Sequence, residues 1–374
     1  MKNKMDEILN LAVKRGASDI HITTGKPPCC RTHGRMEGIE GFPVLTREIT
    51  RKLVYSIITE AQKKRFEETL ELDCSYTIKD LCRFRVNVLQ QKGAVEAVLR
   101  VIPWSIPTPQ EIGLTPAIMR FARAPRGLVL VTGTTGSGKS TTLAALIEDI
   151  NVNREEHIIT IEDPIEFVYQ GKRCVIRQRE VGADTRDFSS ALKHVLRQDP
   201  DIILVGEMRD LETISLALTA AETGHLVFAT LHTQDAPQTV DRIIDVFPPH
   251  QQQQVRVQLS NTLAGVVCQQ LLPRADGRGR VAAREILVCT PAVGNLIREG
   301  KTHQIMNSVE TGGQLGMISM DSSLLHLVNS QVVRPEAALA KAKNVEYLKQ
   351  KIVHTSQPPP GQRSSQQPDH SSGR

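Results

Sequence analysis

The sequence contains few aromatic residues. Only 3 % of its 374 residues are Phe, Trp or Tyr, and there is a single Trp. The formal net charge of +5 is spread along the chain and is not gathered in one basic cluster. Proteins that bind single-stranded nucleic acid stack bases on aromatic side chains along a positively charged groove. We therefore expect no direct nucleic-acid binding.

Long apolar runs are also missing. Runs such as Leu-Val-Leu-Val at 128–131 fall far short of the roughly 20 residues that span a bilayer. The first residues mix charged and apolar side chains and lack the continuous apolar segment of a secretory signal. We expect a cytoplasmic protein.

Cysteine is present, but not in a metal-binding or disulfide pattern. The seven cysteines are an odd number, and no two of them form a Cys-x-x-Cys pair. This spacing argues against a disulfide framework and against a four-cysteine zinc site. Free thiols are the expected state.

The pattern of the remaining residues predicts two folded domains. Residues 1–102 read as a small α+β domain, and 103–117, which contain four prolines, read as a linker. From 118 to 354, apolar strands alternate with longer helical stretches, which is typical of a parallel α/β sheet. Residues 355–374 are rich in Pro, Ser and Gln, and we expect this tail to be disordered.

A phosphate-binding loop is the strongest chemical signal. An apolar strand ends at Val131, the pattern Gly-x-x-x-x-Gly-Lys-Ser follows, and an apolar helix begins at once. The glycines allow backbone N–H groups to surround a phosphate, Lys139 reaches the β and γ phosphates, and Ser140 can bind Mg²⁺. The predicted nucleotide-binding residues are Gly133, Thr134, Thr135, Gly136, Ser137, Gly138, Lys139, Ser140 and Thr141.

Carboxylates follow two further apolar strands. Residues 202–205 form a core strand that brings Glu207 to its C-terminal end, where ligands bind in such sheets. A second strand ends in Glu162, Asp163 and Glu166, and three adjacent carboxylates need a counter-charge such as Mg²⁺ with its bound water. A solvated acidic loop is the alternative for this second group.

Two histidines flank a third apolar stretch, 226–231. If this stretch is a parallel strand, His225 and His232 lie roughly 23 Å apart and cannot share a metal. His232 lies at the same sheet edge as the phosphate-binding loop and is the candidate sensor of the γ phosphate. His225 lies at the opposite edge, where the residues alone favour a structural role, either in capping the preceding helix or at an interface.

An arginine cluster is predicted in the first domain. Residues 82–103 read as a hairpin, and a two-residue loop at Gln91 and Lys92 would set Arg83 opposite Arg100, with Arg85 diagonal to it. Like charges directly opposite in a sheet are destabilising, so the cluster would be explained by an anion. A solvated basic face is the alternative.

Taken together, these motifs resemble the secretion ATPase superfamily. The segments GTTGSGKST, ITIEDPIEF, DIILVGEMRD and GHLVFATLHT occur in the order of its P-loop, Asp box, Walker B and His box. RGLVLVTG, QREVG, ALTAAETGHLVFATLHT and NLIREGK are similar to the retraction ATPases of type IV pili within this superfamily. The resemblance runs from about residue 5 to about residue 350.

The resemblance implies an ATP-hydrolysing, Mg²⁺-dependent homohexamer with a PAS-like N-terminal domain and a RecA-like ATPase domain. It also implies a place at the cytoplasmic face of the inner membrane, with peripheral membrane association only and contact with the pilus platform protein. By the family's motifs, Glu166 and Glu207 are catalytic, with Glu207 bound to Mg²⁺ through water. His225 and His232 are both functional, and the hairpin arginines reach a neighbouring subunit's γ phosphate.

One segment departs from the family pattern. The family's C-terminal signature reads Ala-Ile-Arg-Asn-Leu-Ile-Arg-Glu, and this chain has Val293 and Gly294 in place of the Ile and the first Arg. An accessory retraction paralogue therefore stands beside the principal motor as a candidate. Further candidates are a pilus-assembly or type II secretion ATPase, a RecA-like helicase or DNA translocase, and a nucleotide-gated component without turnover.

Overall fold

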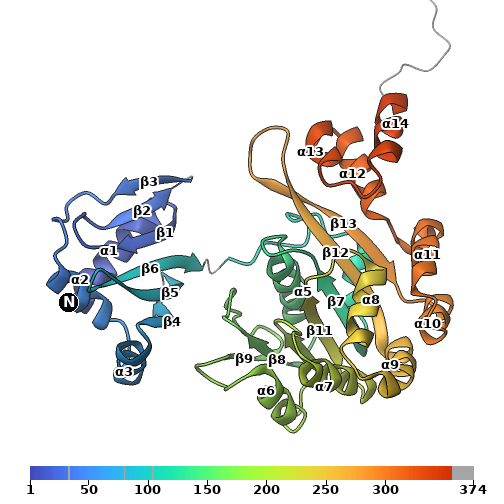
Figure 1. Cartoon of the computed structure of the whole chain (residues 1–374), viewed down its shortest axis with the longest axis horizontal. Coiled ribbons are helices and arrows are strands. Elements are labelled where there is room, and N and C mark those ends of the chain that lie inside the picture. The colour runs from blue at the N-terminus through green and yellow to red at the C-terminus, as the bar shows by residue number, and fades with distance from the viewer. Residues whose placement is uncertain (33, 80, 103–104, 356–374) are drawn as a thin grey trace, which may run out of the picture.

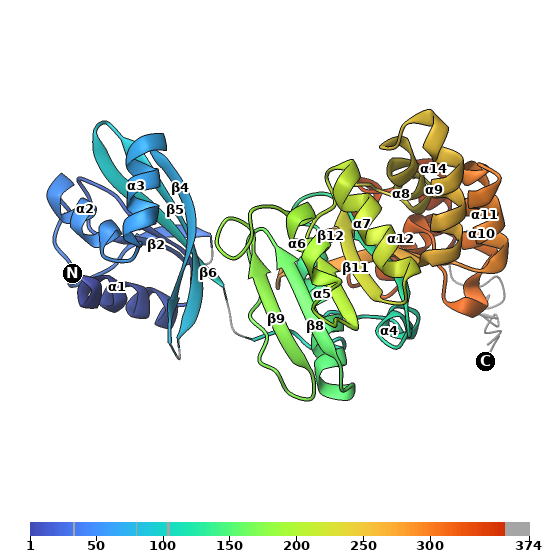
Figure 2. The same cartoon turned by 90° about the horizontal axis from the view of Figure 1, so that it is seen from below.

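The computed structural model describes residues 1–32, 34–79, 81–102 and 105–355. Beyond its first residue, the predicted disordered tail lies outside this range, as do residues 103 and 104 of the predicted linker. Within the described part of the chain, no helix combines the length and the apolar character needed to cross a membrane. Figures 1 and 2 show two structural units that are joined by the segment between β6 and α4.

The N-terminal unit is one antiparallel sheet covered by three helices. Its strand order is β3-β2-β1-β6-β5-β4, and α1 packs its buried residues Met5, Ile8, Leu9 and Ala12 into the core of the unit. The elements are α1 Lys2–Lys14, β1 Ala17–Ile22, β2 Cys29–Thr32, β3 Arg35–Gly38, α2 Arg47–Tyr55, α3 Glu60–Thr69, β4 Glu71–Ile78, β5 Cys82–Gln91 and β6 Ala94–Ile102.

The C-terminal unit contains a seven-stranded sheet with the order β13-β12-β7-β11-β10-β8-β9. All neighbouring strands in it are parallel except β12 and β13, which form an antiparallel hairpin. Its elements up to β13 are α4 Pro116–Phe121, β7 Gly127–Thr132, α5 Lys139–Asn153, β8 His157–Glu162, β9 Val175–Glu180, α6 Phe188–Val195, β10 Ile202–Val205, α7 Leu211–Glu222, β11 Leu226–Leu231, α8 Ala236–Asp245, α9 Pro249–Thr262, β12 Leu263–Pro273 and β13 Arg280–Val288.

Helices cover both faces of this sheet. In β7, Leu128 and Leu130 pack into one apolar core with residues of α6 to α11, while Val129 and Val131 pack into a second core with residues of α4 and α5. Side chains alternate between the two faces along a strand, so a central strand buried on both sides is apolar throughout. This double burial explains why β7, β10 and β11 are fully buried apolar runs.

The chain ends in a group of helices. These are α10 Pro291–Arg298, η1 Thr302–Gln304, α11 Ile305–Thr311, η2 Gly313–Leu315, α12 Met320–Asn329, α13 Pro335–Leu339 and α14 Val345–Thr355. Lys343, in the loop before α14, connects this end of the chain to the sheet. Its Nζ lies 3.0 Å from Asp235 Oδ2 and 3.1 Å from Oε2 of the fully buried Glu285 in β13. Glu285 Oε1 also accepts a hydrogen bond from the Ala236 backbone N–H at the start of α8.

The sequence predicted the parallel α/β pattern correctly for the central strands, and it was wrong after them. No strand follows β13 in the described residues, although strand and helix alternation was expected up to residue 354. The antiparallel hairpin of β12 and β13 was also not foreseen, because two adjoining apolar strands read alike whether their partners are parallel or antiparallel.

Candidate active site

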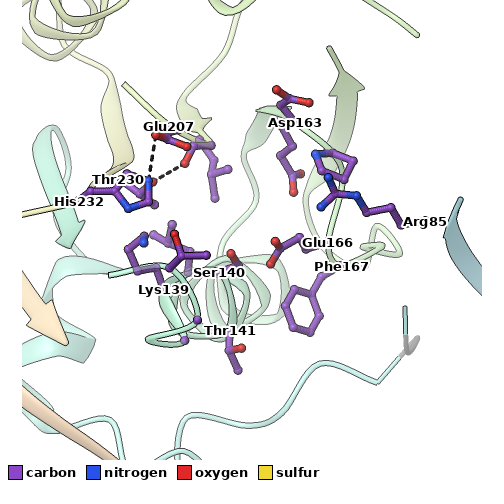
Figure 3. A pocket seen from close by; sticks show the side chains of 18 of the residues that line it. Arg85, Lys139, Ser140, Thr141, Asp163, Glu166, Phe167, Glu207, Thr230 and His232 are labelled. Atoms are coloured by element: carbon purple, nitrogen blue, oxygen red, sulfur yellow. Dashed lines mark hydrogen bonds and ion pairs between the residues drawn. The ribbon is translucent and has the colours of Figure 1, made fainter. Parts of the chain in front are cut away.

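Four parallel strands deliver the predicted site residues to one edge of the sheet. The phosphate-binding loop follows β7, Asp163 and Glu166 follow β8, Glu207 follows β10, and His232 follows β11. Because the C-terminal ends of parallel strands lie at the same edge, these side chains meet around one cavity of about 490 Å³ (Figure 3). The strand boundaries at 202–205 and 226–231 agree with those expected from the sequence.

The loop from 133 to 138 requires glycine at its two ends. Gly133 and Gly138 have φ angles of 139° and 88°. A Cβ added at Gly133 would lie 2.3 Å from the backbone oxygen of Gln269, and one at Gly138 would lie 2.7 Å from the side-chain Nε2 of Gln269. Helix α5 begins directly after Gly138, so its first N–H groups are available to an anion.

The remaining residues of the predicted loop also line open space. Thr135, Gly136, Lys139, Ser140 and Thr141 border the cavity, while Gly133, Thr134 and Ser137 border an adjoining one. The hydroxyl of Ser137 is buried without a hydrogen-bond partner. A buried polar atom of this kind beside free helical N–H groups is consistent with a polar, anionic ligand.

Lys139 is one of the residues that line the cavity. Its Nζ donates hydrogen bonds to the backbone oxygens of Gly133, at 2.8 Å, and Thr134, at 3.2 Å. Burial lowers the pKa of the ammonium, and the negative charges of Glu207 and Glu166 act in the opposite direction. The side chain is thus a partly desolvated cation facing carboxylates, which favours interaction with an anionic ligand.

Glu207 is held by two neighbours. His232 Nε2 lies 2.9 Å from its Oε1, and Arg209 Nη2 lies 2.7 Å from its Oε2. The hydrogen bond from Arg209 is the main cause of a lowered Glu207 pKa; burial opposes this effect and His232 adds to it. Glu207 therefore remains an anion with a fixed orientation, as a ligand of a hydrated metal ion or an acceptor for water requires.

The three acidic residues at the end of β8 and directly after it do not share one environment. Glu162 is buried, and its Oε1 accepts hydrogen bonds from Thr160 Oγ1 at 2.6 Å and Gln178 Nε2 at 3.1 Å. Burial raises its pKa to about 7, although these hydrogen bonds act in the opposite direction. Asp163 and Glu166 are exposed on the cavity wall. Burial disfavours the ionised form of Glu162, so this residue adds less negative charge to the group than expected.

His225 is not brought to the cavity. Its Nδ1 lies 2.9 Å from the backbone oxygen of Ala220 and 3.2 Å from Thr223 Oγ1, at the end of α7. Its backbone oxygen accepts from the N–H of Gly127 at the start of β7, the end of the sheet away from the phosphate-binding loop. These contacts are those of a helix-capping residue, which is one of the two roles that the residues alone had indicated.

The predicted pairing of the arginines was wrong, because the hairpin loop lies one residue later than expected and the partner of Arg100 therefore shifts by two residues. The hairpin turns at Lys92 and Gly93, with positive φ at both, so that Arg85 lies opposite Arg100 and Arg83 lies opposite Ile102. Arg100 Nε lies 2.9 Å from Asp19 Oδ1 in the same unit, and Arg83 Nη2 lies 2.7 Å from Glu180 Oε2 in the C-terminal unit.

Arg85 is the arginine of this cluster that reaches the cavity. It lines the cavity together with Asp163 and Glu166, and Figure 3 shows its side chain extending from the N-terminal unit towards them. The structure gives Arg85 no hydrogen-bond or ion-pair partner among the described residues, whereas Arg83 and Arg100 both have carboxylate partners.

Three residues of the cavity were missed in the sequence. Arg209 fixes Glu207, Thr230 donates from Oγ1 to the backbone oxygen of Gly206, and Arg280 lies at the start of β13 beside the cavity. The position of Arg209 two residues after Glu207 was an available signal. Arg280 had none, because its approach depends on the hairpin of β12 and β13.

No cysteine is among the residues that line this cavity in the described part of the chain. All seven cysteines are free thiols. Among the residues with described coordinates, no three His, Cys, Asp or Glu side chains converge in a way that could hold a metal ion.

The chain is similar to proteins of bacterial secretion systems and type IV pili. The model of the family described as "Type II/IV secretion system protein" matches residues 1–285. The chain is 51 % identical over 337 residues to the type IV pilus retractation ATPase PilT of Pseudomonas aeruginosa, covering 90 % of this chain and 97 % of that protein. It is 41 % identical over 346 residues to the type IV pilus ATPase PilU of the same organism, covering 92 % and 90 %.

A solved structure resembles the whole described arrangement. The crystal structure of the pilus retraction motor PilT with bound ADP has a TM-score of 0.87 and 46 % sequence identity, and the match covers 92 % of this chain and 98 % of that one.

Proposed function

The chain belongs to the type II/IV secretion system protein family, and from this premise we propose that it is the ATP-hydrolysing motor of type IV pilus retraction. The main support for this function is one cavity in which the phosphate-binding loop lies beside Glu166, Glu207 and His232. The second support is that the chain is 51 % identical to a pilus retraction ATPase over nine-tenths of its length. Twitching motility is the cellular activity that such retraction would power.

ATP and Mg²⁺ fit the donor groups of the cavity. The N–H groups of the loop and of the first turn of α5 bind the phosphates, and Lys139 pairs with the β and γ phosphates. Mg²⁺ prefers oxygen ligands and would neutralise phosphate charge; Ser140 would bind it directly and Glu207 through water. Thr141 continues the phosphate contacts at the helix start.

The remaining groups act on water and on the γ phosphate. Glu166, exposed on the cavity wall, is positioned to accept a proton from the attacking water. Glu207 would orient water beside bound Mg²⁺, and His232, which is hydrogen-bonded to Glu207, would sense the γ phosphate at the end of β11. His225 lies at the other end of β11. It would respond to the γ phosphate either through this strand or through a contact with a neighbouring subunit.

For the domain organisation, we propose a PAS-like N-terminal domain over 1–102, a linker over 103–117, and a RecA-like ATPase domain over 118–354. The antiparallel sheet with flanking helices supports the first, and the parallel sheet with its loop after β7 supports the second. Residues 355–374 would form a disordered tail.

For the assembly, we propose a homohexamer at the cytoplasmic face of the inner membrane. It would associate with the membrane only peripherally, through the pilus platform protein. Arg83, Arg85 and Arg100 are the candidate arginines that act between subunits. Arg85 is favoured among the three because Arg83 and Arg100 are already paired with carboxylates, whereas Arg85 has no ion-pair partner in the described residues.

An accessory retraction paralogue is the second candidate, because of Val293 and Gly294 in the family's C-terminal signature. The higher identity to PilT, 51 % against 41 % to PilU, favours the principal motor. A pilus-assembly or secretion ATPase is less well supported, since such proteins typically carry a four-cysteine zinc site. A helicase or DNA translocase would reveal itself by nucleic-acid-stimulated turnover.

Two variants test the chemistry and the cellular role together. Lys139→Ala should weaken ATP binding, whereas Glu207→Gln should bind ATP and lose turnover by roughly a hundredfold or more, because water orientation and charge stabilisation are removed. Binding and turnover are measured on purified protein.

In a strain lacking the gene, pili should form and fail to retract, and the wild-type gene but not Glu207→Gln should restore retraction.

Two outcomes would contradict this assignment. Wild-type turnover in the Glu207→Gln protein would remove the proposed catalytic role of that residue. A deletion strain without surface pili would identify an assembly motor instead.

Mixed rings test whether Arg85 acts between subunits. Arg85→Ala and Glu207→Gln proteins, each of low activity, are mixed and their turnover is measured. If Arg85 serves a neighbour, some interfaces contain both intact groups and activity recovers, since an arginine of this kind contributes up to about a thousandfold. Lys139→Ala mixed with Glu207→Gln is the control, because both changes affect the same site and no mixing restores it. Absence of recovery in Arg85 mixtures with intact rings would place Arg85 in its own subunit's site.

A further inference from the structure

A glutamine outside the nucleotide motifs supports the phosphate-binding loop from behind. Gln269 lies in β12, one residue after Cys268, which is paired with Thr132 at the end of β7. It is 2 % exposed, and both glycines at the ends of the loop approach it so closely that a Cβ on either would clash with it. The loop is therefore packed against Gln269 at both of its ends.

The side chain of Gln269 is hydrogen-bonded to the loop and to the helix that follows it. Its Nε2 donates to the backbone oxygen of Ser137 at 2.6 Å, and its Oε1 accepts from Thr142 Oγ1 at 2.8 Å. Ser137 and Thr142 are themselves buried. One amide thus fixes the loop and the first turn of α5 relative to each other.

Arg284 continues this network away from the loop. It lies directly opposite Gln269 in the neighbouring strand β13, and its Nε donates to Gln269 Oε1 at 2.9 Å. Its Nη1 and Nη2 donate to the backbone oxygens of Gly113 and Ile112, each at 2.9 Å. Those residues belong to the segment that joins the two structural units.

Arg284 is an unusual cation for a purely structural role. It is 7 % exposed, and no carboxylate forms an ion pair with it in the described structure. Burial of a charge without a counter-charge is costly, and burial lowers its pKa to about 10. The three oxygen atoms that accept hydrogen bonds from its side chain are all uncharged, so no ion pair offsets the cost of burying it. What these hydrogen bonds do is connect the joining segment with Gln269.

We propose that Gln269 and Arg284 are positioning residues that hold the phosphate-binding loop in its nucleotide-binding shape and couple it to the segment 112–113. Movement of the N-terminal unit pulls on this segment, and Arg284 and Gln269 transmit the displacement to the backbone of Ser137. Neither residue lines the cavity that contains Lys139, Glu166 and Glu207. The coupling rests on nucleotide binding at the loop, as proposed above, and is independent of pilus retraction.

Matched variants test this role through nucleotide affinity. Gln269→Met keeps the size of the side chain and removes its hydrogen bonds, and we expect the Kd of a fluorescent ATP analogue to rise about tenfold or more. Arg284→Lys keeps the charge and loses the fork-shaped contacts to 112 and 113, and we expect a Kd rise of about threefold to tenfold. In Arg284→Lys, amide hydrogen exchange should become faster in 133–138 and in 112–114 together.

Asn151→Leu is the matched control. Asn151 is another fully buried amide with three hydrogen bonds, to Gln170, Glu148 and Lys172, but it lies near the other end of α5. The Asn151→Leu substitution should lower the thermal stability of the protein, as Gln269→Met does, but leave the Kd of the ATP analogue unchanged.

The outcomes separate three cases. An unchanged Kd in both Gln269→Met and Arg284→Lys, with only thermal stability reduced, would overturn the positioning role. If Gln269→Met does not fold, Arg284→Lys decides by the same measurement. If the wild-type protein itself does not bind the ATP analogue, the proposed ATPase function fails, and this inference fails with it.

Discussion

Glu162 and Glu207 border the same cavity, yet their pKa values are shifted in opposite directions. Burial is the larger influence on Glu162 and raises its pKa to about 7. The hydrogen bond from Arg209 is the larger influence on Glu207 and lowers its pKa. Two carboxyl groups at neighbouring strand ends are thereby given different charges near neutral pH, so repulsion between them is reduced.

The raised pKa of Glu162 makes a prediction about stability against pH. The folded state holds the proton more tightly than the unfolded state, so the contribution of Glu162 is fully present below 4.5 and is lost as the pH rises to about 7. Glu162→Gln keeps an oxygen for Thr160 and Gln178 and cannot ionise. Relative to the wild type, this variant should gain about 2–4 kcal/mol of unfolding free energy across that window.

Chemical denaturation of both proteins at the two ends of the window measures this difference. Identical pH dependence in the wild type and in Glu162→Gln would mean that Glu162 titrates normally.

At the scale of elements, the contact between α9 and α10 explains a departure from the family pattern. Gly294 in α10 is buried, and a Cβ added there would lie 3.1 Å from the backbone oxygen of Ser260 in α9. The two helices therefore approach each other most easily when residue 294 has no side chain. The glycine therefore favours this close packing of the two helices.

Substitutions at Gly294 should follow this geometry. Gly294→Ala gains about 1 kcal/mol of helix propensity and loses a similar amount through the close contact, so little net change is expected. Gly294→Arg must displace α9 and should destabilise the protein by about 1–3 kcal/mol. Thermal unfolding of both variants provides the measurement, and an arginine variant as stable as the parent would contradict the packing explanation.

The elements around the site were largely predictable, and the hairpin register was not. Glu207 and His232 could be placed because fully buried parallel strands have continuous apolar sequences whose ends are easily located. The loop of the arginine hairpin was misplaced by one residue: Lys92 and Gly93 both have positive φ, which favours Gly at the second loop position. The Gly93 signal was available and would have given the correct pairing of Arg85 with Arg100.

Contacts between distant segments had no signal in the sequence. Arg280 and Gln269 reach the phosphate-binding region through the β12–β13 hairpin, whose antiparallel pairing is a tertiary property. The same holds for Glu162, whose burial depends on Gln178 in the edge strand β9. Local patterns identify residues at strand ends, whereas these contacts depend on how strands are ordered in the sheet.

At the scale of the whole molecule, one ion pair connects the two units to the acidic loop. Arg83 from the N-terminal unit contacts Oε2 of Glu180, and the same oxygen accepts from the backbone N–H of Ile165 at 3.0 Å. Ile165 directly precedes Glu166. The position of the N-terminal unit therefore bears on the backbone that carries a proposed catalytic residue.

Breaking this pair should loosen the units and lower turnover. Arg83→Met should increase the radius of gyration in small-angle X-ray scattering, because it leaves Glu180 buried without its cation. Arg100→Met is the control for the scattering measurement alone, since its partner Asp19 lies within the N-terminal unit. If Arg83→Met keeps the dimensions of the wild type and of Arg100→Met, the contact between Arg83 and Glu180 does not hold the units together.

Lys343 sets a limit on how far the chain can be shortened. The family match ends at Glu285, but the carboxylate of Glu285 is fully buried and its cation comes from Lys343, far beyond that point. Glu285 also accepts from the start of α8, the helix that follows His232. We therefore expect the smallest stable ATPase fragment to extend past residue 285, where the family-model match ends, and to include the loop before α14.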